Sequence, residues 1–372
     1  MKTGAINKGG HSGMTEFLTI HEIVKAARQN LSRGVWDYLT GGADTETTLL
    51  RNRQGLESIA FRPRVLRNVK EIDLTASLLG DKMRLPVALA PMGSLDAMES
   101  GGSVSVAKAA EEFGVTSFLS SVTRPGLDEV AEATSHPKIY QLYVRGDHAY
   151  IEESVRRVID KGFQGYCLTV DVAYYSRRER DIIKRYTPRG RVRGVDGWDF
   201  QAGLNWDTVK WFKDSFDIPL IIKGIATAED AAICVDHGVD GVYVSNHGGR
   251  QLDHGRASID VLPEIVKEVG GKAEIIVDGG FMRGTDIVKA IALGADTVAI
   301  GKLQGFGLAA DGVAGIVRVL ELLETEMRVT MGLLGETSLD ALSPAHLYPA
   351  APVYQPHVLS SFPFLNFKDP EY

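Results

Sequence analysis

The segment Gly241-Val-Tyr-Val-Ser245-Asn-His247-Gly-Gly-Arg250 joins a short apolar run to a glycine-rich turn. The run is rich in β-branched and aromatic residues, which is typical of a buried parallel strand. The two glycines between His247 and Arg250 let the backbone turn tightly and approach a ligand closely. The segment therefore predicts a strand whose carboxyl end presents a histidine and an arginine.

These two side chains suit chemistry beside a carboxylate. A neutral imidazole such as that of His247 can accept a proton near pH 7. The guanidinium of Arg250 stays charged and can hold a carboxylate through two parallel hydrogen bonds. A histidine and an arginine in a glycine-rich loop are, however, often only turn and surface residues. The interpretation of this segment therefore depends on the rest of the chain.

Similar apolar runs occur eight times and alternate with helical patterns. The predicted strands cover residues 85–90, 116–119, 139–142, 166–170, 220–223, 241–245, 274–278 and 297–300. The best patterned helices cover residues 104–113, 151–161, 228–237, 259–269 and 284–293. Eight βα units in this order predict an α/β fold, a (β/α)8 TIM barrel of parallel strands with right-handed crossovers. The active site of such a barrel lies at the carboxyl ends of its strands.

The predicted strands end in, or are followed directly by, residues that cluster at one rim of the barrel, many of them polar. In strand order they are Ala90-Pro91-Met92-Gly93, Ser120-Ser121, Gln141 with Tyr143, Thr169 with Asp171, Lys223, His247 with Arg250, Asp278-Gly279-Gly280, and Gly301-Lys302. The loops after the seventh and eighth strands of these barrels often bind a phosphate through glycine amides and a helix N-terminus. The sequence therefore predicts a phosphorylated cofactor at this rim.

Four segments complete the predicted organisation. Residues 1–16 are polar and rich in glycine, and we expect a mobile tail there, before a single barrel domain at residues 17–340. The apolar spacing at residues 19–40 predicts a helical cap that ends at Gly41-Gly42. The long loop at about residues 184–205 predicts a lid. Residues 341–372 are rich in proline and aromatic side chains, and we expect this C-terminal tail to pack on the barrel or on a neighbouring subunit.

Composition argues against several kinds of partner. The chain has 372 residues and a formal net charge of −7, which argues against nucleic acid and implies that an anionic substrate is captured by local charge. Cys167 and Cys234 are the only cysteines, so neither a disulfide framework nor a metal site is expected. Apolar runs of about 18 residues and a signal-peptide core are absent, which predicts a cytoplasmic protein that does not contact membranes.

The segment from Ser245 to Gln251 resembles the signature of the FMN-dependent 2-hydroxy-acid oxidases and dehydrogenases, and the resemblance extends from about Thr19 to about Leu334. This resemblance implies oxidation of an (S)-2-hydroxy acid to the 2-oxo acid, with FMN as cofactor and oxygen as the preferred electron acceptor. A dehydrogenase or a lactate-monooxygenase-like enzyme with another acceptor remains an alternative. The family's habit also suggests a homotetramer.

The resemblance assigns roles around the reacting carbon. His247 resembles the active-site base, and Asp171 resembles the carboxylate that orients and stabilises it. Tyr143 resembles the residue that hydrogen-bonds the substrate oxygen. The substrate-carboxylate ligands that the resemblance implies are Arg250, Arg178 and Tyr38, with Arg177 as an alternative to Arg178.

The resemblance also assigns residues to the cofactor. Lys223 ends an apolar strand, where a charge needs a partner, and it resembles the lysine that lies against the N1 side of the flavin. The ring edge is implied to contact Ala90, Pro91, Met92, Gly93, Ser120, Gln141, Thr169 and Ser245. The ribityl phosphate end is implied to contact Asp278, Gly280, Arg283, Gly301 and Lys302.

The chain departs from the family pattern at several of these positions. Gly93 stands where glycolate and lactate oxidases generally carry alanine, and Val122 and Tyr175 reshape the substrate pocket. Met282 replaces a phosphate-binding arginine, and Lys302 replaces another. Methionine offers no donor and lysine is a point charge, so weaker FMN binding is expected unless the neighbouring Arg283 compensates. A flavin-poor scaffold without redox function is the competing hypothesis of another class.

Overall fold

The computed structural model describes residues 17–188 and 197–366, so the predicted tail at residues 1–16 lies outside the described part. Eight parallel strands form a closed barrel in chain order, and the last strand pairs with the first. The strands are β4 (Val87–Leu89), β5 (Ser117–Ser120), β6 (Lys138–Leu142), β7 (Gly165–Thr169), β8 (Leu220–Ile225), β9 (Gly241–Val244), β10 (Glu274–Val277) and β11 (Thr297–Ile300). The predicted (β/α)8 TIM barrel is confirmed.

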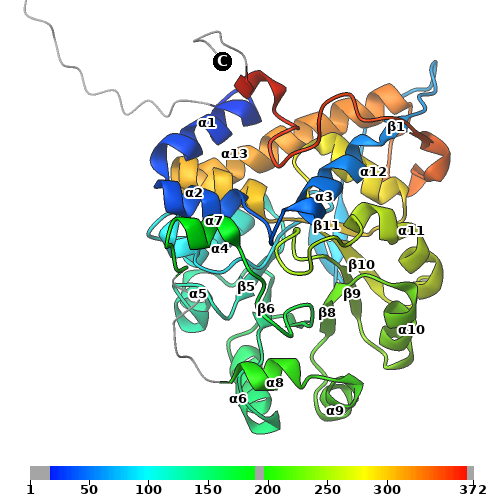
Figure 1. The fold of residues 1–372 in the computed structure, drawn as a ribbon. Helices are drawn as coiled ribbons and strands as arrows, with labels where there is room; N and C mark the ends of the chain where they lie inside the picture. The colour runs from blue at the N-terminus through cyan, green and yellow to red at the C-terminus, as the bar shows by residue number, and fades with distance from the viewer. Residues whose placement is uncertain (1–16, 189–196, 367–372) are drawn as a thin grey trace, which may run out of the picture.

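Helices surround the barrel, and the main core lies between them and the outer face of the strands (Figure 1). They are α4 (Gly102–Phe113), α5 (Leu127–Ala133), α6 (His148–Asp160), α9 (Trp206–Ser215), α10 (Ala228–Asp236), α11 (Ser258–Val269), α12 (Gly284–Ala292) and α13 (Lys302–Leu334). The helical path of α13 is interrupted at Asp311 and Gly312. Each buried leucine, isoleucine or valine of this core stabilises the fold by roughly 1.5–3 kcal/mol relative to an exposed side chain.

A second apolar cluster fills the inside of the barrel. Phe118, Tyr243 and other inward-facing strand residues are buried there. The hairpin of β2 (Ala76–Leu78) and β3 (Asp81–Met83) adds Leu78 and Met83 to the same cluster. The interior is therefore packed, which leaves the carboxyl ends of the strands as the place for a ligand.

The N-terminal cap consists of two main helices rather than the single helix that the apolar spacing predicts. α1 (Ile20–Asn30) ends before Leu31, and α2 (Arg33–Thr40) begins after Ser32. The hydroxyl oxygen of Ser32 accepts a hydrogen bond from the amide of Val35 at 3.3 Å, which is a helix N-cap. α1 lies along α13 (Figure 1), and α3 (Thr47–Glu57) follows α2 and precedes a short strand at residues 59–61.

The predicted lid at residues 184–205 is partly helical. α7 (Glu179–Ile183) ends just before it, and α8 (Trp198–Ala202) lies within it, so the segment is not loop throughout. Residues 189–196 lie outside the described part. The short 3-10 helix η1 (Leu95–Ala97) follows β4 on the same rim.

The described part of the C-terminal tail packs on its own barrel. β12 (Leu347–Pro349) pairs antiparallel with β1 (Ile59–Phe61), and Phe362 is fully buried. Short 3-10 helices complete the tail: η2 (Leu339–Ala341), η3 (Pro344–His346) and η4 (Pro363–Asn366). Of the two predicted packing partners, the barrel is therefore the observed one for residues 341–366.

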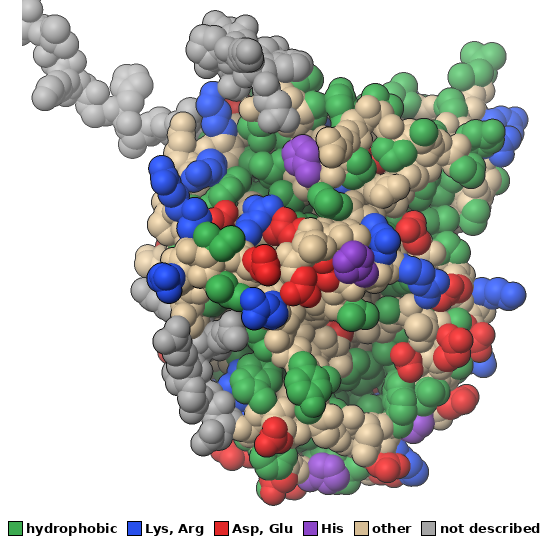
Figure 2. Space-filling view, in the orientation of Figure 1, with side chains coloured by type: hydrophobic (Ala, Val, Ile, Leu, Met, Phe, Trp, Pro, Cys, Tyr) green, Lys and Arg blue, Asp and Glu red, His purple; other side chains and the backbone are tan. Residues whose placement is uncertain are grey.

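The surface carries mixed charge. On the face that Figure 2 shows, Lys and Arg side chains of the described residues are interspersed with Asp and Glu. None of the helices in residues 17–188 and 197–366 has the length and apolar character needed to cross a membrane. The same residues contain no group of three metal-binding side chains, and Cys167 and Cys234 are buried as free thiols.

Candidate active site

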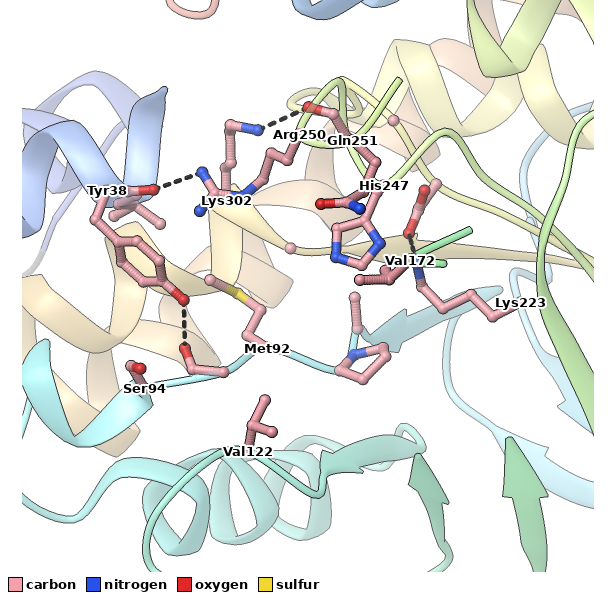
Figure 3. Close-up of a pocket in the computed structure, with 18 of the residues that line it drawn as sticks. Tyr38, Met92, Ser94, Val122, Val172, Lys223, His247, Arg250, Gln251 and Lys302 are labelled. Carbon is pink, nitrogen blue, oxygen red and sulfur yellow. Dashed lines mark hydrogen bonds and ion pairs between the residues drawn. The ribbon is translucent and has the colours of Figure 1, made fainter. Parts of the chain in front are cut away.

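A cavity opens at the carboxyl ends of the strands and brings together most of the predicted site residues. Those that line it are Tyr38, Ala90, Pro91, Met92, Gly93, Tyr143, Arg178, Lys223, His247, Arg250, Asp278, Gly280, Gly301 and Lys302. His247, Arg250 and Lys302 lie on one side of the cavity and Val122 on the other (Figure 3). Six predicted residues are not part of the lining, namely Ser120, Gln141, Thr169, Asp171, Ser245 and Arg283.

His247 is held on both sides of its ring. Its Nδ1 lies 2.9 Å from Oδ1 of Asp171, and its Nε2 lies 3.3 Å from the hydroxyl oxygen of Tyr143. Its backbone φ of 58° lies in the left-handed region that non-glycine residues rarely adopt. The amide of His247 donates to Oγ of Ser245 at 3.0 Å, which supports this turn. A carboxylate at Nδ1 favours the tautomer that carries its proton there, so Nε2 becomes the proton acceptor.

The charges of this pair are set by burial and by mutual attraction. Burial lowers the pKa of His247, although Asp171 opposes the shift. Burial alone would raise the pKa of Asp171, but His247 and Lys223 outweigh it and hold this pKa below its usual value. The imidazole is therefore neutral near pH 7, beside a carboxylate that can stabilise its protonated form.

Arg250 extends from the same turn to the end of α2. Its Nη1 donates to the carbonyl oxygens of Tyr38 and Gly41 at 2.5 and 2.9 Å, and its guanidinium carbon lies 4.8 Å from the centroid of the Tyr38 ring. The Tyr38 hydroxyl donates to the carbonyl oxygen of Gly93 at 3.2 Å. Burial, and next the charge of Arg178, lowers the pKa of Arg250. Two buried guanidiniums this close favour an anionic ligand between them.

Arg178, rather than Arg177, lines the cavity, because Arg178 is buried whereas Arg177 is exposed. Its Nε donates to the carbonyl oxygen of Arg250, and its Nη2 donates to Oε1 of Gln251, both at 3.3 Å. The amide nitrogen of Gln251 in turn donates to the carbonyl oxygen of Tyr174 at 2.9 Å. Gln251 is therefore a positioning residue that the sequence analysis missed, although its place directly after Arg250 was the available signal.

Lys223 is buried within β8 and has polar neighbours. Its Nζ lies 3.1 Å from Oγ of Ser245 and 3.6 Å from Oδ2 of Asp278. Ser245 also donates to Oδ1 of Asp278 at 2.6 Å. Burial would lower the pKa of Lys223, but Asp278 and Asp171 outweigh it, so this pKa is raised and the side chain is a cation. A fixed cation at this point can stabilise negative charge on a bound ring system.

The edge that is expected to hold the flavin ring has an unmatched acceptor. Nε2 of Gln141 donates to Oγ1 of Thr169 at 2.8 Å, whereas Oε1 of Gln141 is buried without a hydrogen-bond partner among the described residues. An unsatisfied buried acceptor costs about 1–3 kcal/mol, so a ligand N–H is favoured here. The hydroxyl oxygen of Ser120 has a partner within the protein, because it accepts a hydrogen bond from the amide of Val122 at 3.4 Å. A flavin ring edge, which presents an N–H, fits Gln141.

The opposite end fits a phosphate with a single cation. Gly280 and Gly301 line it, and a Cβ added to Gly301 would meet no atom nearer than 3.9 Å. Nζ of Lys302 donates to the carbonyl oxygen of Gly248 at 3.1 Å. Burial, and next the charge of Arg250, lowers the pKa of Lys302 to about 7, although Asp278 and Glu46 oppose the shift. A bound anion would therefore stabilise the charged lysine. The residues present therefore fit FMN, with Lys302 and glycine amides at its phosphate.

The structure corrects the predicted role of Arg283. Its Nη2 lies 2.5 Å from Oε1 of Glu326 on α13, and its Nη1 donates to the carbonyl oxygen of Ser361 at 3.4 Å. Arg283 is thus directed to the C-terminal segment and is not part of the cavity lining. Met282 does line the cavity and offers no donor, so Arg283 does not compensate for it.

The wall at Gly93 is closely packed against Val122. A Cβ added to Gly93 would lie 3.1 Å from Cγ2 of Val122 and 3.6 Å from the Tyr38 hydroxyl oxygen. The other wall is aromatic and is formed by Tyr175 and Trp198. The cavity therefore has a small-residue wall and an aromatic wall.

Known proteins share this architecture. The family model for FMN-dependent dehydrogenase matches residues 27–349. Glycolate oxidase 1 of Oryza sativa subsp. indica is 38% identical over 356 residues, which cover 90% of this chain and 96% of that protein. L-lactate oxidase of Nostoc sp. is 37% identical over 357 residues, with coverage of 89% and 98%. A crystal structure of mandelate oxidase with (S)-2-phenylpropionate matches with a TM-score of 0.83 at 35% identity, over 91% of this chain and 100% of that chain. The protein is thus a member of the FMN-dependent dehydrogenase family, and FMN is its cofactor.

Proposed function

We propose that the protein oxidises an (S)-2-hydroxy acid to the corresponding 2-oxo acid, with bound FMN accepting the two electrons and oxygen serving as the final acceptor. The observation that carries this proposal is the arrangement of a neutral imidazole and two guanidiniums around one cavity. The base can act on the carbon that bears the hydroxyl only if the neighbouring carboxylate is held in place. His247, Arg250 and Arg178 provide these two functions.

The residues divide the work as follows. Arg250 and Arg178 hold the substrate carboxylate, and the carbonyl oxygens of Tyr38 and Gly41 fix the direction of Arg250. Tyr143 donates to the substrate oxygen, and Nε2 of His247 takes the proton. Asp171 stabilises the imidazolium that forms. Burial of these groups strengthens each of these electrostatic interactions.

The reductive half-reaction tests the proposal directly. FMN-loaded protein is mixed without oxygen with a panel of (S)-2-hydroxy acids that runs from lactate to mandelate and includes malate and 2-hydroxyglutarate, and the flavin absorbance is followed. We expect loss of absorbance with at least one acid and none with its (R)-enantiomer. Protein that binds FMN but is bleached by no acid would contradict the proposed activity. Protein that stays colourless and does not bind added FMN would support the scaffold hypothesis instead.

Readmission of air then separates the oxidase from its alternatives. An oxidase recovers its absorbance quickly and releases one hydrogen peroxide for each 2-oxo acid. Slow recovery in air would indicate a dehydrogenase, and a decarboxylated product in place of peroxide would indicate a monooxygenase. Gly93, which stands where glycolate and lactate oxidases generally carry alanine, keeps these two alternatives in consideration.

We also propose a homotetramer in the cytoplasm. Val65 and Leu66 are 80% and 103% exposed, and such a pair of exposed apolar side chains suits a subunit contact. Light scattering of the FMN-loaded protein is expected to give four times the chain mass, and fractionation of native cells is expected to recover it in the cytosol. A monomer mass at micromolar concentration would contradict the assembly.

A further inference from the structure

Arg145 is a cation of the cavity that the proposed reaction does not use. It follows Tyr143 by two residues where the chain leaves β6, and both side chains line the cavity. The intervening Val144 does not line it and is buried elsewhere. Alternate residues of an extended segment face the same side, so the spacing itself places Arg145 beside Tyr143.

Aromatic rings hold Arg145 in a fixed direction. Its guanidinium carbon lies 4.2 Å from the centroid of the Trp198 ring at the start of α8. The Trp198 ring meets the Tyr175 ring edge to face at 6.1 Å, and the guanidinium carbon of Arg178 lies 4.5 Å from the Tyr175 ring. A row of cations and rings therefore joins Arg178 to Arg145 along one wall. Stacking orders a guanidinium while leaving its N–H donors for a ligand.

The other cations of the cavity already have partners or ligands. Lys223 pairs with Asp278, Arg178 and Arg250 face the reacting carboxylate, and Lys302 lies at the phosphate end. Burial lowers the pKa of Arg145, and the ionisable groups in the described part that oppose this shift are only Tyr150 and Tyr143, which are neutral near pH 7. A half-buried cation without a carboxylate partner in residues 17–188 and 197–366 is available to an anion on the ligand.

We propose that Arg145 is a specificity-determining residue that binds a second carboxylate on the substrate, so that the preferred substrates are (S)-2-hydroxy dicarboxylic acids. This inference rests on the proposed function and adds the substrate class to it. Two residues of extended chain span about 7 Å, which sets the approximate spacing between Tyr143 and Arg145. A substrate whose hydroxyl lies at Tyr143 can therefore reach Arg145 with a second carboxylate that is several bonds from the hydroxyl-bearing carbon. 2-Hydroxyglutarate spans this separation better than the shorter malate. A neutral or aromatic side chain would leave Arg145 unpaired.

A charge-matched substrate pair tests the inference. (S)-2-Hydroxyglutarate and its 5-amide have the same shape, but only the acid carries a second charge. The ratio of kcat/KM for the acid to kcat/KM for the amide is expected to be about tenfold or more in the parent, as a hydrogen bond between charged groups provides. Arg145→Met removes the charge and should bring the ratio close to one, whereas Arg145→Lys should retain part of it.

Three outcomes would overturn the inference. The first is a ratio of kcat/KM for acid to amide near one in the parent, and the second is a ratio that persists in Arg145→Met. The third is an equal loss of kcat/KM for acid and amide in Arg145→Met, which would make Arg145 only a support for Trp198.

Calorimetric titration with 2-oxoglutarate and 2-oxopentanoate gives a readout that requires no turnover. If no hydroxy acid reduces the flavin, the proposed function fails, but tighter binding of 2-oxoglutarate that depends on Arg145 would still support the second carboxylate site. Equal binding of 2-oxoglutarate by the parent and Arg145→Met would overturn it.

Discussion

The His247→Asn variant is expected to reduce its FMN about a hundredfold to ten-thousandfold more slowly than the parent, which is the range that a general base contributes. Nε2 of His247 is the basic atom beside Tyr143, and an asparagine amide cannot accept a proton near pH 7. Asparagine is preferred to alanine here because it tolerates the left-handed backbone that His247 adopts, so the turn is preserved. Anaerobic stopped-flow absorbance with a saturating hydroxy acid measures the rate.

His346 provides a matched control for this variant. Its Nε2 lies 3.0 Å from Oε1 of Glu336, so it also pairs with a carboxylate, but it lies in η3 and outside the cavity lining. His346→Asn should therefore reduce FMN at the parent rate. A parent rate in His247→Asn, with FMN bound, would show that another group is the base.

The barrel could be predicted because its strands are buried on both faces. Such strands are nearly continuous apolar runs between turns. When strands and helices alternate regularly along the chain, few topologies are possible.

The exact ends of the strands were less predictable from the sequence. β4 begins at Val87 rather than at Leu85, because Pro86 has no N–H for the ladder, although its carbonyl oxygen accepts from Val298 at 2.9 Å.

The N-terminal cap shows a different limit of prediction from the sequence, namely the position of a helix boundary. Apolar spacing continues from α1 into α2, so periodicity alone joins them into one helix. The break is caused by Ser32, whose side chain caps α2. The capping signal was present in the sequence, but serine is also common within helices, and only its hydrogen bond to Val35 decides between these roles.

The polar rim was predictable for the same reason as the barrel, since the carboxyl ends of parallel strands meet at one place. The direction in which each long side chain points was not predictable from the sequence. Arg283 follows β10 as expected, but Glu326, which is distant in the sequence, takes its guanidinium away from the cavity. Arg145 is directed into the cavity by Trp198, which lies in a segment interpreted only as a lid. Tertiary partners, rather than local pattern, therefore determined which cations serve the ligand.

The loss of one phosphate ligand at Met282 makes FMN affinity depend on Lys302, and we expect this affinity to fall as the pH rises above about 7. In the FMN-free protein, burial and the charge of Arg250 lower the pKa of Lys302 to about 7. A bound phosphate raises that pKa, so above pH 7 the lysine must take up a proton when FMN binds. Affinity then falls by up to about tenfold for each pH unit, or up to about a hundredfold between pH 7 and pH 9.

Lys302→Arg is the matched variant, because a guanidinium stays protonated throughout this range. Titration of the FMN-free protein with FMN, followed by flavin fluorescence at pH 7, 8 and 9, should give a steep decline in affinity for the parent and a much flatter profile for Lys302→Arg. Riboflavin, which lacks the phosphate, should show little of this dependence with either protein. Parent affinity for FMN that stays constant from pH 7 to pH 9 would mean that Lys302 keeps its proton in the free protein, with Asp278 and Glu46, the two carboxylates that raise its pKa, as its effective partners.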